Sequence, residues 1–190
     1  LFRVKADGTI ENFKYNAKDP HSLSSNFVRA CCEDNLGNIW IGTFNGLNRY
    51  NKITGLFQNH TANDTQADGL THSSIWCIVK DNQGTLWLGT YFGGVNYFNP
   101  EYEIYTRYSY SSNEKKGLSN PVVGRTIEDK DGNLWIGTEG GGLNYYNRRT
   151  REFKWYRPQE GRNSISHNNV KALYYLSLIH ISEPTRRSYI

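Results

Sequence analysis

The sequence predicts an all-β fold built from repeated sheets of four strands, and two observations carry this prediction. The composition combines 14 Tyr, 8 Phe, 5 Trp and 18 Gly in 190 residues with no Met, a mixture that favours short strands joined by tight turns. In addition, the pattern Asp-x-x-Gly-x-(Ile/Leu)-Trp-(Ile/Leu)-Gly-Thr occurs three times, starting at Asp34, Asp81 and Asp129, so that the copies are 47 and then 48 residues apart. Each copy is therefore expected to form one equivalent sheet.

Four strands are expected in each repeat. In the first repeat they lie at residues 28–33, 39–43, 47–50 and around Phe57. The Asp-x-x-Gly step between the first two suits a hairpin turn, because Asp accepts backbone hydrogen bonds and Gly adopts positive φ. The second strand is apolar on both faces, as a strand covered by two neighbouring sheets requires. Further first strands are expected to start at Ile75, Val123 and Val170.

A period in the high forties with four strands is typical of β-propeller blades, whereas helical repeats would need a periodicity of about 3.6 residues, which is missing here. We therefore expect a partial β-propeller with about three complete four-stranded blades and a part-blade at each end. The expected units are the last strands of a preceding blade (1–22), three blades (23–69, 70–117 and 118–163), the first strand of a following blade (164–175) and a tail (176–190).

The tail does not continue the repeat. The register places the turn Asp at position 176 and the Trp at position 182, where the sequence has Leu176 and Ser182. The stretch from Leu176 onward also resembles the translation of a sequencing-library adaptor. Residues 176–190 are therefore expected to be non-native, and no functional argument rests on them.

Charge and cysteine content argue against several classes of protein. The net charge of +4 comes from scattered Lys and Arg, so an electrostatic surface for nucleic acid is not expected. No apolar run approaches the roughly 18 residues that cross a bilayer. Cys31, Cys32 and Cys77 have no metal-type spacing and are expected to be small buried residues.

The repeated residues are expected to be structural anchors. Each repeated Trp could bury roughly 150–250 Å², which corresponds to at most about 4–6 kcal/mol of transfer free energy. The repeated Asp and Gly would form the turn that precedes it. The expected anchors are Asp34, Gly37, Trp40, Asp81, Gly84, Trp87, Asp129, Gly132 and Trp135.

Candidate binding residues lie where the repeats differ. If the strands alternate in direction, the loops before the first strands and the turns between second and third strands share one face. Those turns vary sharply between repeats, and Trp76 replaces the Arg29 and Gly124 of the other copies. Loops on a rigid scaffold commonly carry binding groups, although these residues could also be exposed turns or packing contacts. The candidates are Phe44, Asn45, Trp76, Tyr91, Phe92 and Glu139.

His72 and His167 occupy one repeat position, which holds Ser25 and Asn120 in the other copies. A position that accepts Ser, Asn and His is expected to form a turn or strand cap. No catalytic role is expected for either histidine.

Asp129, Asp131 and Asn133 match part of a calcium-loop pattern. The downstream Glu of such a loop is missing, and the equivalent repeats lack the second acid. Turn chemistry is therefore the expected role of Asp129, and no cofactor, metal or catalytic residue is predicted.

The pattern Asp-x-x-Gly-Asn-(Leu/Ile)-Trp-Ile-Gly-Thr, followed by Gly-Leu-Asn-x-Tyr-Asn, resembles the two-component regulator propeller repeat over roughly residues 1–175. The resemblance implies the periplasmic sensor region of an inner-membrane hybrid two-component histidine kinase, which signals by phosphorelay to control transcription, in some relatives in response to oligosaccharides. It implies as partners an oligosaccharide ligand, the remaining blades and a β-sandwich of the parent chain, and a second copy in a homodimer. The segment itself would be non-catalytic.

Two other functions stay open at this stage. One is a propeller that binds a partner without signalling, which only downstream sequence separates from a sensor. The other is a propeller lyase or glycosidase, which would need carboxylates, Arg or His groups that converge within the ring. The acids and histidines of this chain instead cluster at turns.

Overall fold

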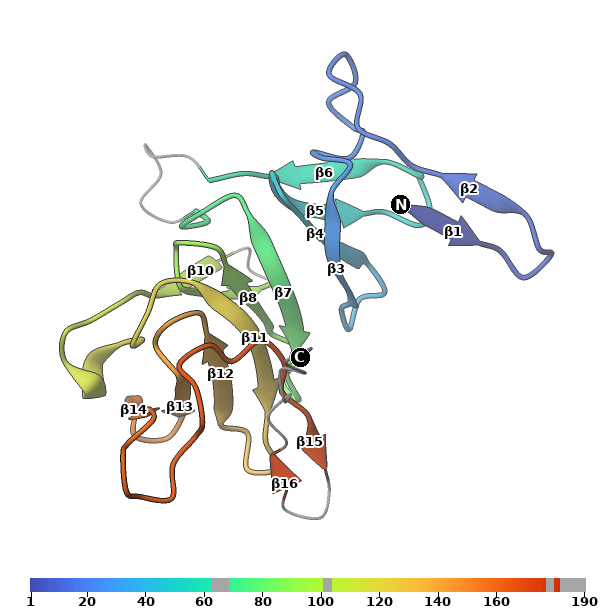
Figure 1. The fold of residues 1–190 in the computed structure, drawn as a ribbon. Helices are drawn as coiled ribbons and strands as arrows, with labels where there is room; N and C mark the ends of the chain where they lie inside the picture. Colours follow the sequence, from blue (N-terminus) through green and yellow to red (C-terminus); the bar gives the residue numbers. More distant parts are fainter. Residues whose placement is uncertain (63–68, 101–103, 177–179, 182–190) are drawn as a thin grey trace, which may run out of the picture.

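Three four-stranded antiparallel sheets stand side by side in the computed structural model, which describes residues 1–62, 69–100, 104–176 and 180–181 (Figure 1). In each sheet the strands follow one another in chain order. The first sheet contains β3 (Val28–Glu33), β4 (Ile39–Thr43), β5 (Gly46–Tyr50) and β6 (Phe57–His60). The second contains β7 (Ile75–Lys80), β8 (Leu86–Thr90), β9 (Val95–Asn99) and β10 (Ile104–Tyr108), and the third contains β11 (Val123–Glu128), β12 (Leu134–Thr138), β13 (Leu143–Asn147) and β14 (Glu152–Tyr156).

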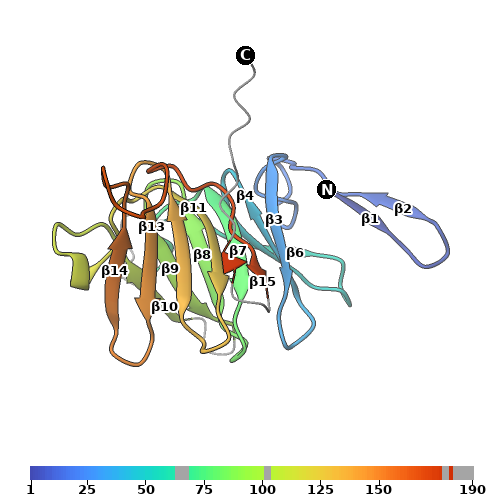
Figure 2. The ribbon, with the colours of Figure 1, turned by 60° about the horizontal axis from the view of Figure 1, so that its bottom comes forward.

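The sheets are arranged as neighbouring blades of a propeller. The first strands β3, β7 and β11 lie next to one another on the inner side, and the fourth strands β6, β10 and β14 lie on the outer side (Figures 1 and 2). The chain therefore has the predicted all-β fold, a partial β-propeller with three complete blades.

Shorter elements flank the three blades. At the N-terminal end, β1 (Phe2–Val4) pairs with β2 (Ile10–Asn12) in a two-stranded antiparallel sheet. A single 3-10 turn, η1 (Glu114–Lys116), precedes the third blade, and β15 (Tyr175–Leu176) pairs with β16 (His180–Ile181). Within the described residues, no helix is long and apolar enough to span a membrane.

The strand expected to start at Val170 does not form. The Val170 side chain is buried and its backbone N–H donates to the Thr138 carbonyl at 3.0 Å, but residues 170–174 belong to no strand. A first strand of a blade is held by a second strand, and the Asp-turn-Trp segment that would form one is missing from the sequence here. Of the tail predicted to be non-native, residues 177–179 and 182–190 lie outside the described residues.

An aspartate and a tryptophan close the first hairpin of every blade. Asp81 Oδ1 accepts hydrogen bonds from the backbone N–H groups of Gln83 (2.9 Å) and Thr85 (3.0 Å), and Oδ2 accepts from the Trp87 indole N–H (2.7 Å). Gly84 has a φ of +84° in this turn, a backbone conformation that is unfavourable for residues with a Cβ atom. The same indole bond joins Trp40 to Asp34 (2.7 Å) and Trp135 to Asp129 (3.1 Å), with Gly37 and Gly132 at φ of +80° and +79°.

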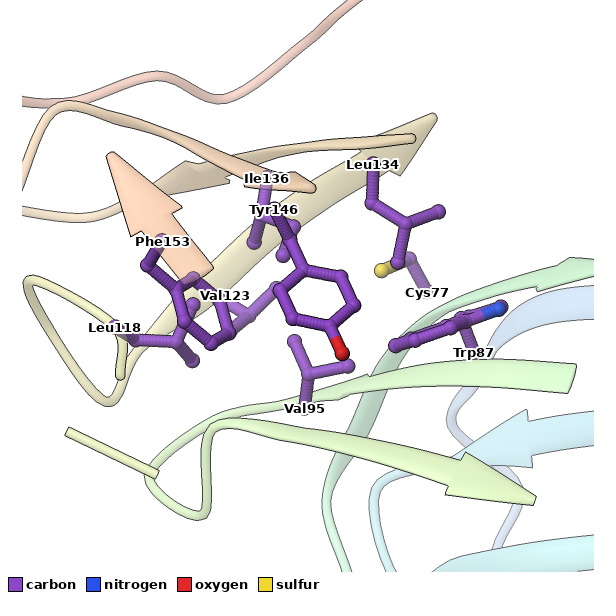
Figure 3. Close-up of a cluster of buried hydrophobic side chains, with 9 residues drawn as sticks. All are labelled: Cys77, Trp87, Val95, Leu118, Val123, Leu134, Ile136, Tyr146 and Phe153. Carbon is purple, nitrogen blue, oxygen red and sulfur yellow. The ribbon is translucent and has the colours of Figure 1, made fainter. Parts of the chain in front are cut away.

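The hydrophobic core lies between the blades. Trp40 is fully buried and its ring lies 5.0 Å from that of Phe98 on the second blade. Trp87, with 1% of its surface exposed, packs against the third blade in the cluster shown in Figure 3. The remaining members of that cluster are Cys77, Val95, Leu118, Val123, Leu134, Ile136, Tyr146 and Phe153.

The cysteines differ in their burial. Cys77 is buried as expected and Cys32 is half-buried, but the prediction that all three are buried is wrong for Cys31, which is exposed. Cys31 lies beside a cavity of about 330 Å³ between the two-stranded N-terminal sheet and the first blade. Because the N-terminal sheet has two strands where a complete blade has four, it leaves this face of β3 partly uncovered.

Replacing a buried repeat Trp with Phe removes the indole donor, although the carboxylate oxygen keeps a second donor, Asn38 Nδ2 for Asp34 and Arg148 Nη2 for Asp81. A hydrogen bond to a charged group contributes about 1.5–3 kcal/mol and the smaller ring leaves a cavity, so Trp40→Phe and Trp87→Phe are each expected to lower the free energy of unfolding by about 2 kcal/mol. Trp135 is only half-buried, so Trp135→Phe serves as the control and is expected to cost less than half as much. Urea unfolding followed by circular dichroism measures all three values, and equal losses would contradict this account.

Acid is expected to weaken the first blade through Asp34. Burial raises the pKa of Asp34, but hydrogen bonds from Trp40, Asn38 and Leu36 outweigh it, so the pKa lies below its ordinary value of 3.8. A carboxyl with a lowered folded-state pKa stabilises the fold above its unfolded pKa, and this stabilisation disappears as pH falls through the folded pKa. The free energy of unfolding should therefore decline below about pH 3.8.

Urea unfolding between about pH 2 and pH 6 tests this dependence. The Asp34→Asn variant cannot titrate at this position and should show a flatter decline. A decline of the same size in the variant would assign the acid sensitivity to other groups.

Candidate functional site: an aromatic patch across two blades

Buried asparagines hold the loops that precede the first strands. Asn48, on β5, is fully buried; its Oδ1 accepts from the Ser24 backbone N–H (2.8 Å) and its Nδ2 donates to the Ile41 carbonyl (3.1 Å). The loop is thereby fixed to the middle of its own blade. The equivalent bonds run from Thr71 N–H to Asn96 Oδ1 (3.0 Å) and from Ser119 N–H to Asn144 Oδ1 (2.8 Å).

The turns between second and third strands are tied to these loops. The Phe44 N–H donates to the Phe27 carbonyl at 3.0 Å. In the second and third blades, the Tyr91 N–H donates to the Ser74 carbonyl and the Glu139 N–H donates to the Val122 carbonyl, both also at 3.0 Å. The expectation that these loops and turns share one end of the sheets is therefore confirmed. This end carries the side chains in which the repeats differ.

Five aromatic residues and one arginine meet at this end, across the boundary between the first and second blades. The Arg29 guanidinium on β3 lies 3.9 Å from the centre of the Trp76 ring on β7 and 5.2 Å from that of Phe44. Trp76 stacks on Tyr91, with ring centres 5.7 Å apart and planes at 28°. Phe27 contacts Phe44 (6.4 Å) and Phe92 contacts Tyr91 (4.3 Å). We call Phe27, Arg29, Phe44, Trp76, Tyr91 and Phe92 the aromatic patch.

The rings of the patch differ in their access to solvent. Phe27, Phe44 and Phe92 are 73%, 55% and 57% exposed, whereas Trp76 and Tyr91 are half-buried. Trp76, expected to be a ligand platform, is in contact with Arg29 and Tyr91, and the three Phe rings are more exposed than it is. The Trp76 indole nitrogen is buried and has no hydrogen-bond partner among the described residues, so this donor of the patch is unmet.

Two of the predicted binding residues do not join the ring contacts of the patch. Asn45 is exposed next to Phe44, and its backbone N–H donates to Thr43 Oγ1 (3.1 Å). Glu139 belongs to the third blade, where its carboxylate forms an ion pair with Lys171 at 3.4 Å. The other four candidates, Phe44, Trp76, Tyr91 and Phe92, are brought together.

Sequence reasoning did not select Phe27 or Arg29 as binding residues. Phe27 stands in a loop assigned to the variable face, so its position and its aromatic character were available as a signal. Arg29 differs from Trp76 and Gly124 at one repeat position, and this difference alone does not indicate a binding role. Its contact with Trp76 joins residues 47 positions apart and depends on how two blades pack.

The histidines form turns, as expected. His72 Nδ1 accepts from the Ser74 N–H (3.0 Å), and His167 Nδ1 accepts from the Asn169 N–H (2.9 Å). The Ser25 hydroxyl and the Asn120 amide oxygen accept the equivalent bonds from Phe27 and Val122. The His72 ring also lies 6.1 Å from that of Phe92, at the edge of the patch.

The carboxylate of Asp129 stabilises the hairpin turn in which it lies. It accepts from the N–H groups of Asp131 (3.0 Å) and Asn133 (2.8 Å) and from the indole of Trp135. A calcium ion would have to compete with these three donors. In the described part of the chain, no group of three or more His, Cys, Asp or Glu side chains is placed to hold a metal ion.

Solved structures show the same fold at low sequence identity. The extracellular domain of a protein described as a hybrid two component system, BT3049 from B. thetaiotaomicron, matches with a TM-score of 0.72 and 20% identity, over 80% of this chain and 21% of that chain. Virginiamycin B lyase from Staphylococcus aureus matches with a TM-score of 0.58 and 13% identity, over 84% of this chain and 49% of the lyase. This chain thus spans about a fifth and about half of their lengths.

Family comparison is more specific than the fold. The model described as "Two component regulator propeller" matches residues 22–45, 69–92 and 117–140, and no match was found among curated proteins. Each matched segment runs from the loop before a first strand, through the Asp-Trp hairpin, to the turn that follows the second strand. The three repeats of this chain therefore each contain a segment that matches the two component regulator propeller family.

Proposed function

We propose that this chain is a segment of the extracytoplasmic, ligand-sensing β-propeller of a hybrid two-component sensor histidine kinase. The observation that carries the proposal is the threefold occurrence of the two component regulator propeller repeat. The likeness to the extracellular domain of a hybrid two component system agrees with it in fold. In this proposal the segment lies in the periplasm, and the kinase and its phosphorelay belong to other parts of a longer protein.

The proposed role of the segment is to bind a ligand and pass on the effect through blade packing. The aromatic patch joins β3 of one blade to β7 of the next. A ligand that contacts both blades stabilises their interface and shifts any equilibrium in which that interface changes. The remaining blades, a β-sandwich and a second copy of the parent would receive this effect.

We propose an oligosaccharide as the ligand. The exposed rings of Phe27, Phe44 and Phe92 offer apolar faces suited to the C–H faces of pyranose rings, and the Asn45 amide lies beside Phe44 to bond hydroxyl groups. Binding sites of this kind combine apolar walls with a few polar groups that fix orientation.

The likeness to virginiamycin B lyase concerns the fold, since the identity is 13% and one fold supports many functions. Around the aromatic patch, His72 accepts a hydrogen bond from the Ser74 backbone N–H, and Glu139 forms an ion pair with Lys171. These contacts favour binding over acid–base chemistry. A propeller that binds without signalling would use the same patch, and the repeat family favours the sensor.

A direct binding experiment tests the proposed site. The chain is titrated by calorimetry with neutral and acidic tetrasaccharides, including cellotetraose, xylotetraose, tetragalacturonate and a hyaluronan tetrasaccharide. Phe44→Ala and Phe92→Ala are expected to weaken binding about ten-fold or more, which corresponds to about 1.4 kcal/mol. Tyr110, 56% exposed and outside the patch, provides the matched control, because Tyr110→Ala should bind as the unchanged chain does. Binding that resists both Phe substitutions would place the site elsewhere.

A further inference from the structure

Arg29 occupies the centre of the aromatic patch and reaches from one blade to the next. Its guanidinium lies against the rings of Trp76 and Phe44, and Nη1 donates to Ser74 Oγ at 3.2 Å. The residue is half-buried, so its charge has lost part of its hydration. A guanidinium has five N–H donors, and within the described part of the chain one hydrogen bond is formed.

No carboxylate of the described residues lies within 4.0 Å of Arg29. Several other cations of the described residues are paired with carboxylates. Arg148 contacts the carboxylates of Asp81 and Glu128, and Lys171 contacts Glu139. Arg29 is therefore a partly buried positive charge with unused donors, surrounded by aromatic rings.

We infer that the aromatic patch takes an acidic oligosaccharide and that Arg29 is the residue that selects its carboxylate or sulfate group. This inference rests on the proposed function, in which the patch binds a sugar, and adds the class of sugar. The planar guanidinium matches an oxyanion with two parallel N–H···O bonds. Such a pair restores the interactions that a half-buried cation lacks, whereas a neutral hydroxyl restores them only in part.

The placement of the rings fits the same ligand. Phe44 and Tyr91 belong to the turns of successive blades, and Arg29 and Trp76 belong to their first strands. A sugar ring that lies on exposed Phe44 or Phe92 would bring a substituent acid group toward Arg29, which lies between the two turns. Phe27 extends the surface beyond Phe44 and would contact a neighbouring sugar unit.

The test compares acidic tetrasaccharides with their carboxyl-reduced forms, which differ only in CO₂⁻ against CH₂OH. Tetragalacturonate and a hyaluronan tetrasaccharide are titrated into the chain by calorimetry. We expect the acidic form of the sugar that binds to bind at least about ten-fold more tightly than its reduced form. Its affinity should fall as salt rises from about 50 to about 250 mM, because screening weakens a partly exposed ion pair.

Substitutions assign this preference to Arg29. Arg29→Gln should abolish the preference for the acidic form, and Arg29→Lys should retain only part of it, because an ammonium cannot form the bidentate pair. Lys171→Gln is the matched control: it removes one positive charge from an already paired residue at the same end of the sheets and should keep the preference. Thermal unfolding of each variant shows whether the fold is intact. The salt dependence is measured on the chain without substitutions, so it tests the charge contribution even if a variant fails to fold.

Each outcome decides between the two proposals. Equal binding of acidic and reduced forms, or a preference that survives in Arg29→Gln, would overturn the role of Arg29 and leave sugar binding standing. Failure of both acidic tetrasaccharides to bind, with cellotetraose or xylotetraose bound, would also overturn the inference alone. Failure of all the sugars would overturn the proposed oligosaccharide ligand as well.

Discussion

The fold depends on one hydrogen bond in each blade, between a turn carboxylate and a buried indole N–H. Asp81 illustrates why it matters: the same carboxylate that accepts the backbone N–H groups of its turn also fixes the orientation of Trp87. The indole then packs against the next blade, so the local turn determines the long-range contact. An aspartate six residues before a tryptophan is therefore a single unit of hairpin formation and blade packing.

This framework allows the side chains at one end of the sheets, where the loops before the first strands meet the turns after the second strands, to vary. Buried Asn48 and its equivalents hold the loop before each first strand, and backbone bonds tie the following turn to that loop. The turn side chains contribute little to this scaffold, since the bonds involve backbone atoms. The repeat position after the second strand can consequently hold different side chains without a change in the backbone, and it holds Phe44, Tyr91 and Glu139 in the three blades. This is expected for a repeat scaffold that carries a binding surface.

The sequence was sufficient for the fold because its signals are local. The β4 strand was predicted at its observed bounds, since Asp34, Gly37 and the alternation around Trp40 lie within ten residues. The candidate site was predicted only in part: the variable turns were located, but the contact between Arg29 and Trp76 depends on the packing of separate sheets. The strand expected at Val170 failed for a related reason, because a matching opening segment does not form a blade without its second strand.

Equivalent positions need not contribute equally to stability. Arg148 follows β13 and contacts Asp81 of the preceding blade, lies 5.1 Å from the Trp87 ring, and also pairs with Glu128. Pro100 occupies the equivalent position in the second blade, so Asp34 receives no such cation from that position. The second and third blades are therefore joined by an ion pair in addition to their apolar core, whereas the first and second blades are joined through Arg29 and its aromatic neighbours. A ligand at the aromatic patch thus acts on the interface that lacks the Arg148 contact, where added binding energy has the larger relative effect on blade packing.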